Sequence, residues 1–350
     1  MKRQSMHHRK EITMRKVLCE LRTATPNLRT VVVRYAIGIV FGTICVMAMV
    51  PRAHSAQAQM APGDHQETLK LGGFDRTFLV HVPSGFDGKT KLPAVIMLHG
   101  AGGSGASAAR ETGWSSEADQ EGFLAVYPEA MPGRPDEASR FMTNPRLWND
   151  GSGRGRLAPK IDDVGFLATV IGYLEQSYAA DPARIYVTGM SNGASMAFRA
   201  GIALANQVAA IAPVAGRLWM TDQQLTSPVP LLFIIGTADP LNPLAGGDIK
   251  LPWGNSEHRA AVDKSLTEWR AMLGCTGDAR TVLDRNGVKE LQWDKCAKGG
   301  EVVYYTVEGL GHVWPGGTTR LPERLVGKAS NKLDATTVIW TFFKAHPRQQ

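Results

Sequence analysis

The sequence predicts an α/β fold in which one mainly parallel central sheet carries helices on both faces. Short apolar runs alternate with longer stretches of helical spacing, and several of these runs contain no polar residue. Strands that alternate with helices are typical of parallel sheets buried on both sides. No internal repeat or change of composition divides the chain after residue 71. We therefore expect a single domain over residues 71–346.

The individual elements follow from local periodicity. Strands are predicted where period-2 alternation or short apolar runs meet turn-forming residues, at 76–82, 93–100, 122–128, 184–189, 208–216, 229–239 and 301–309. Helices are predicted where small or apolar residues recur at helical spacing, at 104–121, 162–180, 194–206, 256–273 and 333–346. Asp162 or Asp163 is expected to cap the second helix. A stretch rich in Pro, Gly and Arg at 131–160 is expected to be a long loop.

Residues 1–58 are predicted to be a secretory leader. They contain ten Lys/Arg and two Asp/Glu, and an uncharged apolar run of fifteen residues at 36–50 is short for a transmembrane helix. The small residues Ala56 and Ala58 suit a signal peptidase, so cleavage after Ala58 is expected. An uncleaved membrane anchor stays open as the alternative. We expect a secreted protein, extracellular or periplasmic, without stable membrane association once the leader is removed, and a flexible segment at 59–70.

The charge balance excludes one class of partner. The formal net charge of +7 would suggest a nucleic-acid or membrane-surface partner. The residues after the leader, however, contain 29 Lys/Arg and 30 Asp/Glu. Because the positive surplus belongs to the leader, no nucleic-acid partner is expected.

Two cysteines, Cys275 and Cys296, lie beyond the leader. In an exported protein they most simply form a disulfide with each other, which would stabilise the fold by about 3 kcal/mol. Two buried free thiols remain the alternative. The sequence contains neither the CxxC spacing nor the Cys/His cluster of a zinc site, so no metal is expected.

The segment GMSNG at 189–193 is the single match in the chain to the pattern G-x-S-x-G. A predicted strand precedes it and a predicted helix follows it, which is the setting that a nucleophile elbow requires. The serine of such an elbow adopts a strained backbone conformation, and small residues fit two positions before and after it. Ser191 is therefore the candidate nucleophile, against the alternative of a polar residue in a glycine-rich turn.

A serine nucleophile needs a base and a group that orients the base. In folds with this elbow the acid and the histidine follow the serine along the chain, each on a loop after a later strand. Asp239 meets this condition after the strand at 229–239, with Asp248 as a competitor, and His312 meets it after the strand at 301–309. The other histidines lie in the leader, before the serine, in a predicted helix or in the tail.

Acyl transfer also needs hydrogen-bond donors for the oxyanion. One expected donor is the backbone N–H of Asn192, directly after the nucleophile. The other is the backbone N–H of Ala101 in the segment LHGAGGSG, with Gly102 as the fallback. His99 in the same segment is expected to brace the turn.

The segments IMLHGAGG, GMSNGASMA, GTADPLNP and GLGHVWPGG together resemble the polyhydroxybutyrate depolymerase and feruloyl esterase family of α/β-hydrolases. The resemblance spans about residues 75–345 and includes the paired cysteines. It implies the α/β-hydrolase fold and a secreted serine esterase without cofactor. The implied substrates are polyesters of hydroxy acids, or hydroxycinnamoyl and related esters of plant polysaccharide. Because polyester-degrading members often carry a further substrate-binding domain, which this sequence lacks, we expect a soluble or small ester.

Substrate contacts and alternative functions stay open at this stage. Trp148 and Trp314 are candidates for an aromatic wall, as is Trp253, although core packing explains each tryptophan equally well. The basic pair Arg154 and Arg156 could meet an acidic substrate, but a solvated loop is the simpler explanation. A serine peptidase of the same fold and a non-catalytic polysaccharide-binding homologue are the functional alternatives.

Overall fold

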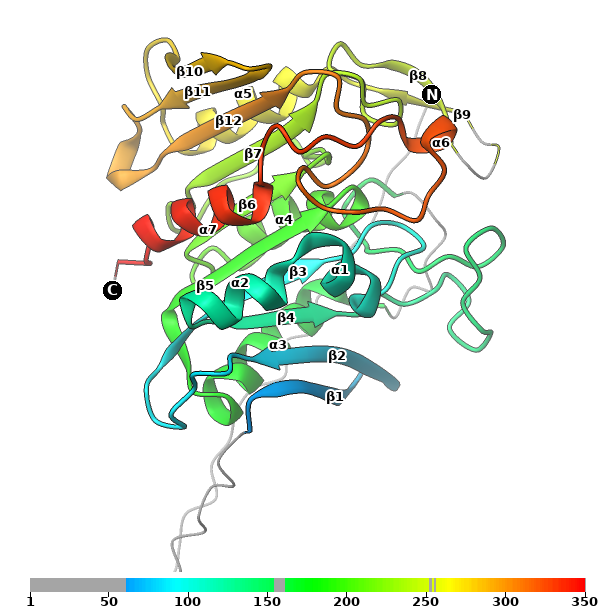
Figure 1. Cartoon of the computed structure of the whole chain (residues 1–350), viewed down its shortest axis with the longest axis vertical. Coiled ribbons are helices and arrows are strands. Elements are labelled where there is room, and N and C mark those ends of the chain that lie inside the picture. Colours follow the sequence, from blue (N-terminus) through cyan, green and yellow to red (C-terminus); the bar gives the residue numbers. More distant parts are fainter. Residues whose placement is uncertain (1–60, 154–160, 252–253, 255, 350) are drawn as a thin grey trace, which may run out of the picture. The chain divides into compact units, whose positions relative to one another are not determined.

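The structure is a computed structural model that describes residues 61–153, 161–251, 254 and 256–349 (Figure 1). The predicted leader, with its cleavage site after Ala58, lies outside these residues, as do Arg154, Arg156 and Trp253. The described residues belong to one compact unit, Ala56–Gln350. None of the helices within the described ranges has the length and apolar character needed to cross a membrane.

A ten-stranded sheet forms the centre of this unit, in the order β1-β2-β4-β3-β5-β6-β7-β12-β11-β10. Its strands are β1 (Gly63–Leu71), β2 (Phe74–Val82), β3 (Leu92–Leu98), β4 (Leu124–Pro128), β5 (Ala180–Met190), β6 (Ala210–Val214), β7 (Leu231–Gly236), β10 (Arg280–Arg285), β11 (Val288–Trp293) and β12 (Val302–Val307). The strands from β4 to β12 in this order pair in parallel. The strands at both edges pair antiparallel. The predicted mainly parallel central sheet is confirmed.

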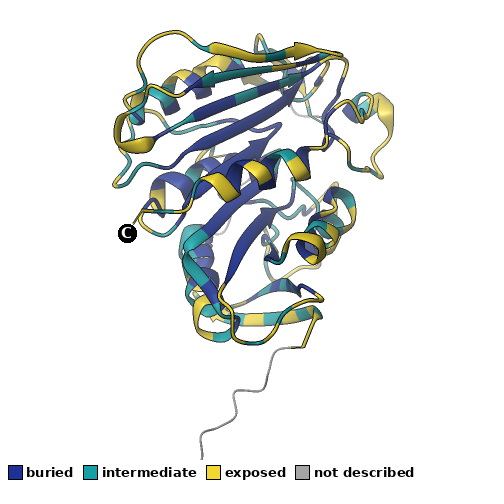
Figure 2. Ribbon diagram, turned by 60° about the vertical axis from the view of Figure 1, so that its left-hand side comes forward, coloured by how far each residue is buried: buried dark blue, intermediate teal, exposed yellow. Residues whose placement is uncertain are grey.

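Helices cover both faces of the sheet, as Figure 1 shows. One layer consists of α1 (Gly105–Thr112), α2 (Trp114–Glu121) and α7 (Ala335–Ala345), and the other of α3 (Asp163–Ser177), α4 (Asn192–Ala203) and α5 (Val262–Met272). Strands β3, β4, β6 and β7 are buried at every position because both faces are covered (Figure 2). Shorter elements are the hairpin β8 (Gly247–Lys250) and β9 (Ser256–Arg259), the helix α6 (Glu323–Val326) and the 3₁₀ turn at Ala297–Gly299.

Three expectations about the elements are wrong. The segment at 59–70, expected to be flexible, contains most of β1, which pairs with β2 along its whole length. Its exposed residues alternate with half-buried ones because β1 is an edge strand with one covered face. The helix expected at 104–121 is two helices, since Gly113 has φ 74° and ends the first one. The helix expected at 256–273 begins at Val262, and His258 lies in β9 instead.

Cys275 and Cys296 form a disulfide, as predicted. Cys275 follows α5, and Cys296 follows β11. The bond therefore fastens the helix layer to the antiparallel end of the sheet, where β10 and β11 were not predicted from the sequence.

Candidate active site

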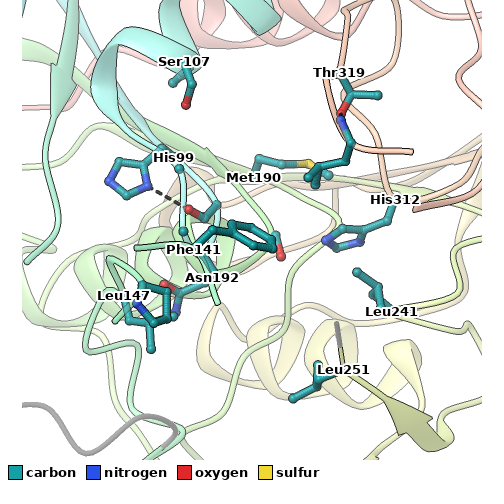
Figure 3. Close-up of a pocket in the computed structure, with 18 of the residues that line it drawn as sticks. His99, Ser107, Phe141, Leu147, Met190, Asn192, Leu241, Leu251, His312 and Thr319 are labelled. Carbon is teal, nitrogen blue, oxygen red and sulfur yellow. Dashed lines mark hydrogen bonds between the residues drawn. The ribbon is translucent and has the colours of Figure 1, made fainter. Parts of the chain in front are cut away.

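Four loops meet where the parallel strands end. Ser191 follows β5, Asp239 follows β7, His312 follows β12, and the loop that begins at His99 follows β3. Because the carboxyl ends of parallel strands lie at one edge of a sheet, residues distant in sequence come together there. A cavity of about 890 Å³ opens at this edge, and Ser191 and His312 both line it. Figure 3 shows the imidazole of His312 extending into this cavity.

Ser191 has the backbone conformation expected of a nucleophile elbow. Its φ of 58° and ψ of −116° lie outside the regions that L-residues ordinarily adopt. The two flanking glycines permit this turn. A side chain at Gly193 would place its Cβ 2.1 Å from the carbonyl oxygen of Leu98, and one at Gly189 would place it 2.5 Å from the carbonyl oxygen of Gly193. The strand, the turn and the helix α4 therefore pack backbone against backbone.

His312 and Asp239 are in direct contact. The Nδ1 of His312 lies 2.8 Å from the Oδ2 of Asp239, and both residues are buried. The second carboxylate oxygen of Asp239 accepts hydrogen bonds from the backbone N–H groups of Leu241 (2.8 Å) and Asn242 (2.7 Å). The carboxylate is thus fixed on both sides, which fixes the orientation of the ring that it contacts.

Asp248, the competing candidate for the acid, lies elsewhere. Its side chain is 83% exposed on the β8–β9 hairpin and pairs with His258 at 2.8 Å. Asp239 is therefore the carboxylate that reaches His312. No hydrogen bond joins the Ser191 hydroxyl to the His312 ring, although the two described residues share the cavity.

The loop after β3 supplies the cavity wall beside Ser191. A Cβ at Gly100 would lie 3.5 Å from the Cβ of Ser191, so the two loops touch at this point. The N–H of Gly102, the fallback donor, is already bonded to the carbonyl of Arg146 (2.8 Å). The N–H groups of Ala101 and Asn192 have no hydrogen-bond partner within the described ranges, and both residues line the cavity.

His99 braces this loop. Its Nε2 accepts a hydrogen bond from the N–H of Ala130 (3.0 Å), so the proton resides on Nδ1, which donates to the carbonyl of Gly100 (2.7 Å; Figure 3). Burial lowers the pKa of His99, which favours the neutral ring that these two bonds require.

Trp148 does not line the cavity but packs behind the loop that does. Its side chain is buried, and its Nε1 donates to the carbonyl of His99 (3.0 Å). The side-chain amide of Asn192 forms two hydrogen bonds with the backbone of Trp148. It accepts from the N–H (2.7 Å) and donates to the carbonyl (3.1 Å). Core packing, the alternative left open for Trp148, agrees with these contacts.

Trp314 does line the cavity, although it is also largely buried. Its Nε1 donates to the hydroxyl of Thr336 (3.0 Å) at the start of α7, which fixes the ring. Apolar residues that the sequence did not single out form much of the remaining wall: Met142, and Phe141, Leu147, Met190, Leu241 and Leu251 (Figure 3). They come from irregular loops and strand ends, where periodicity gives no signal. Within the described part of the chain, no group of three His, Cys, Asp or Glu could hold a metal ion.

Comparisons with known proteins find that the chain is similar to esterases. The family model described as "Esterase PHB depolymerase" matches residues 77–240. A protein from Nocardia uniformis subsp. tsuyamanensis that is named as an esterase, NocK, is 29% identical over 280 residues, which are 75% of this chain and 77% of the relative. Feruloyl esterase B from Piromyces equi is 28% identical over 242 residues, or 68% of this chain. The match spans 42% of that relative, so the chain covers less than half of its length.

A solved structure shares the fold. The acetyl xylan esterase from Aspergillus awamori superposes with a TM-score of 0.51 at 14% identity, covering 71% of this chain and 94% of the other. At this identity the likeness concerns the arrangement of sheet and helices.

Proposed function

We propose that Ser191, His312 and Asp239 are the catalytic triad of this carboxylic ester hydrolase. The proposal is supported by the similarity of the chain to the polyhydroxybutyrate depolymerase and feruloyl esterase family of α/β-hydrolases. The observation that carries this proposal is the 2.8 Å contact between His312 and Asp239, with Ser191 on the wall of the same cavity. An oriented imidazole beside a strained serine is the arrangement that activates a hydroxyl.

The proposed reaction proceeds through an acyl-enzyme. The Ser191 oxygen attacks the ester carbonyl while Nε2 of His312 takes the hydroxyl proton, and Asp239 stabilises the resulting imidazolium. His312 then gives this proton to the leaving alcohol as the carbonyl–oxygen bond breaks. A water molecule, deprotonated by the same ring, attacks the acyl-enzyme, and its proton returns to Ser191. For this transfer, a movement of the Ser191 or His312 side chain has to bring the hydroxyl into contact with Nε2.

Two backbone N–H groups are proposed to stabilise the oxyanion of the tetrahedral intermediate. The N–H groups of Ala101 and Asn192 are free of other partners among the described residues, and both residues line the cavity. Asn192 is also the first residue of α4, so the helix dipole favours negative charge at this position. Gly102 is excluded from this role by its hydrogen bond to Arg146.

The proposed substrates are esters of hydroxycinnamic acids on plant polysaccharide or esters of the poly(3-hydroxybutyrate) type. A cavity of about 890 Å³ lined by Phe141, Met190 and Trp314 offers far more apolar surface than an acetyl group would fill. This supports an acyl group of aromatic or oligomeric size. The disulfide between Cys275 and Cys296 supports export to an oxidising compartment, as the leader predicts.

The test is a substrate panel of methyl ferulate, soluble hydroxybutyrate oligomers and acetylated xylan, assayed with wild type and Ser191→Ala. We expect turnover of at least one of the first two and a rate loss of about 10⁴-fold or more in the variant. Hydrolysis that survives in Ser191→Ala would refute the triad. Turnover of acetylated xylan alone would refute the proposed acyl size.

A further inference from the structure

We propose that Asn242 is a positioning residue for the reaction, and that two buried arginines, Arg217 and Arg259, hold it in place. The inference rests on the proposed function, because it takes Asp239 as the acid of the triad. Asn242 lies three residues after Asp239 and is 1% exposed. Neither Asn242 nor Arg217 lines the cavity, so neither contacts substrate there.

Asn242 contacts the acid through its backbone. Its N–H donates to the Oδ1 of Asp239 at 2.7 Å, while the Oδ2 faces His312. Together with the N–H of Leu241, which donates to the same oxygen at 2.8 Å, this bond sets the rotation of the carboxylate about its own axis. That rotation in turn decides whether the second oxygen meets the imidazole.

The side chain of Asn242 is held by three groups. Its Oδ1 accepts hydrogen bonds from the Nε of Arg217 (3.1 Å) and from the Nη1 of Arg259 (2.5 Å). Its Nδ2 donates to the carbonyl of Ala215, which follows β6. An amide supplies an acceptor and a donor on the same short side chain, which a leucine lacks and an aspartate only half provides. Bonds from guanidinium groups are charge-assisted and therefore stronger than neutral ones.

Arg217 and Arg259 connect Asn242 to helix α4 and to the β8–β9 hairpin, respectively. The backbone N–H of Arg217 donates to the hydroxyl of Ser195 (3.1 Å) in α4, four residues after the nucleophile. Its guanidinium also donates to the carbonyls of Pro243 (2.9 Å) and Ala260. The loop that carries the acid is thus fastened to the helix that carries the serine.

Arg259 links Asn242 to the wall of the cavity. It ends β9, lines the cavity and pairs with Glu257 at 3.2 Å. Both residues lie on the β8–β9 hairpin, which contributes Ser256 to the same wall. A continuous set of hydrogen bonds therefore runs from this wall through Arg259 and Asn242 to Asp239.

Loss of the Asn242 side chain should act on the chemical step. A displacement of the acid by a fraction of an ångström weakens the orientation of His312, and errors of this size lower catalytic rates strongly. For Asn242→Ala we expect kcat to fall about 10- to 100-fold. We expect KM to stay within about twofold, since Asn242 lies outside the cavity. Because partial unfolding also lowers the apparent kcat without changing KM, kcat is calculated per active site titrated with the fluorophosphonate probe.

The experiment compares three variants with wild type on p-nitrophenyl butyrate, together with the rate of labelling by a fluorophosphonate probe. Asn242→Ala removes the side chain, whereas Asn242→Asp keeps an acceptor for both guanidinium groups but loses the donor to Ala215, and should recover part of kcat. Glu301→Gln is the stability control, because Glu301 pairs with His346 and does not line the cavity. We expect it to lower the melting temperature without changing kcat. If Asn242→Ala does not fold, Asn242→Ser replaces it, since a serine hydroxyl is too short to meet both arginines.

The outcomes are distinguishable. A lowered kcat and labelling rate in Asn242→Ala, recovery in Asn242→Asp and normal kinetics in Glu301→Gln support the inference. Wild-type kcat in Asn242→Ala, or equal losses in all three variants, overturns it. Ser191→Ala, assayed alongside, tests the underlying function: if it is inactive while Asn242→Ala is fully active, the triad stands and the positioning role fails.

Discussion

His312 and Asp239 are separated by 73 positions in the sequence and by 2.8 Å in the structure, Nδ1 to Oδ2, with both side chains buried. Each follows the end of a parallel strand, β12 or β7, and these two strands are neighbours in the sheet. The strand order therefore brings His312 and Asp239 into contact. The rigid sheet holds the two loops at a fixed spacing.

Replacing the buried acid should abolish most activity. In Asp239→Asn the amide cannot accept the imidazole proton in the same way, so the ring loses its favoured tautomer, and we expect kcat to fall by roughly 10³- to 10⁴-fold. Asp248→Asn is the matched control, because this aspartate is exposed and pairs with His258. Steady-state kinetics of both variants on p-nitrophenyl butyrate is the measurement. Comparable losses in the two would contradict the choice of Asp239.

The elbow glycine should not tolerate a methyl group. In Gly193→Ala the new Cβ would meet the Leu98 and His99 carbonyl oxygens at 2.1 and 2.5 Å, both on rigid backbone. We expect loss of activity and of stability. Gly172→Ala is the control: this helical glycine has nothing within 4 Å of the added Cβ, and the change should stabilise the protein by about 0.5–1 kcal/mol. The measurement is the free energy of unfolding of both variants in urea. A Gly193→Ala protein of wild-type stability would refute the predicted clash.

The burial of each strand explains how well the sequence predicts its position. Strands β3, β4, β6 and β7 contain no charged residue and are buried at every position, so short apolar runs in the sequence predict where they lie. Edge elements gave no such signal: β10 is mostly exposed, and β1 alternates between exposed and half-buried positions within a polar segment. Gly113 divides α1 from α2 through a positive φ, which a helical pattern of small residues does not reveal.

Removal of the disulfide should cost stability but not activity. Cys275 and Cys296 are 21 positions apart, and a bridge of this span stabilises by about 3 kcal/mol in the chain-entropy model. In the double serine variant we expect the melting temperature to fall by roughly 5–10 °C. Because neither cysteine lines the cavity, kcat should be unchanged. An unchanged melting temperature would show that the bond contributes nothing to the folded state.

The pair formed by His346 and Glu301 should make stability depend on pH. Burial acts to lower the pKa of His346, but its contacts with Glu301 and the Phe342 carbonyl outweigh burial, and the pKa is raised from 6.5. The hydrogen bond from His346 lowers the pKa of Glu301 from 4.5. The stabilisation from His346 is complete below pH 6.5 and is lost as pH rises through the higher folded value. That from Glu301 is present above pH 4.5 and is lost on further acidification.

The two effects overlap between pH 4.5 and 6.5, where the pair contributes most. We therefore expect the difference in unfolding free energy between wild type and Glu301→Gln to be larger at pH 5.5 than at pH 8.5. Urea titrations at the two pH values measure it. A difference that is equal at both, or larger at pH 8.5, would contradict the predicted role of the pair.

The candidate site was predictable where motifs coincide with strand ends. Ser191, Asp239 and His312 each follow an apolar strand in the required order, which is a signal that a single sequence contains. Asn242 lies in the segment GTADPLNP, yet its role depends on Arg217 and Arg259, which come from a loop after β6 and from the end of β9. Such convergence of distant polar side chains has no periodicity, so the sequence offered no means of finding it.

The most direct test of the proposed triad is fluorophosphonate labelling of the wild-type protein, followed by peptide mass spectrometry and a parallel assay of ester hydrolysis. We predict one adduct, on Ser191, which forms at the same rate as activity is lost and is absent from Ser191→Ala. An adduct on another residue, or hydrolysis that persists after Ser191 is fully labelled, would contradict the assignment of the nucleophile.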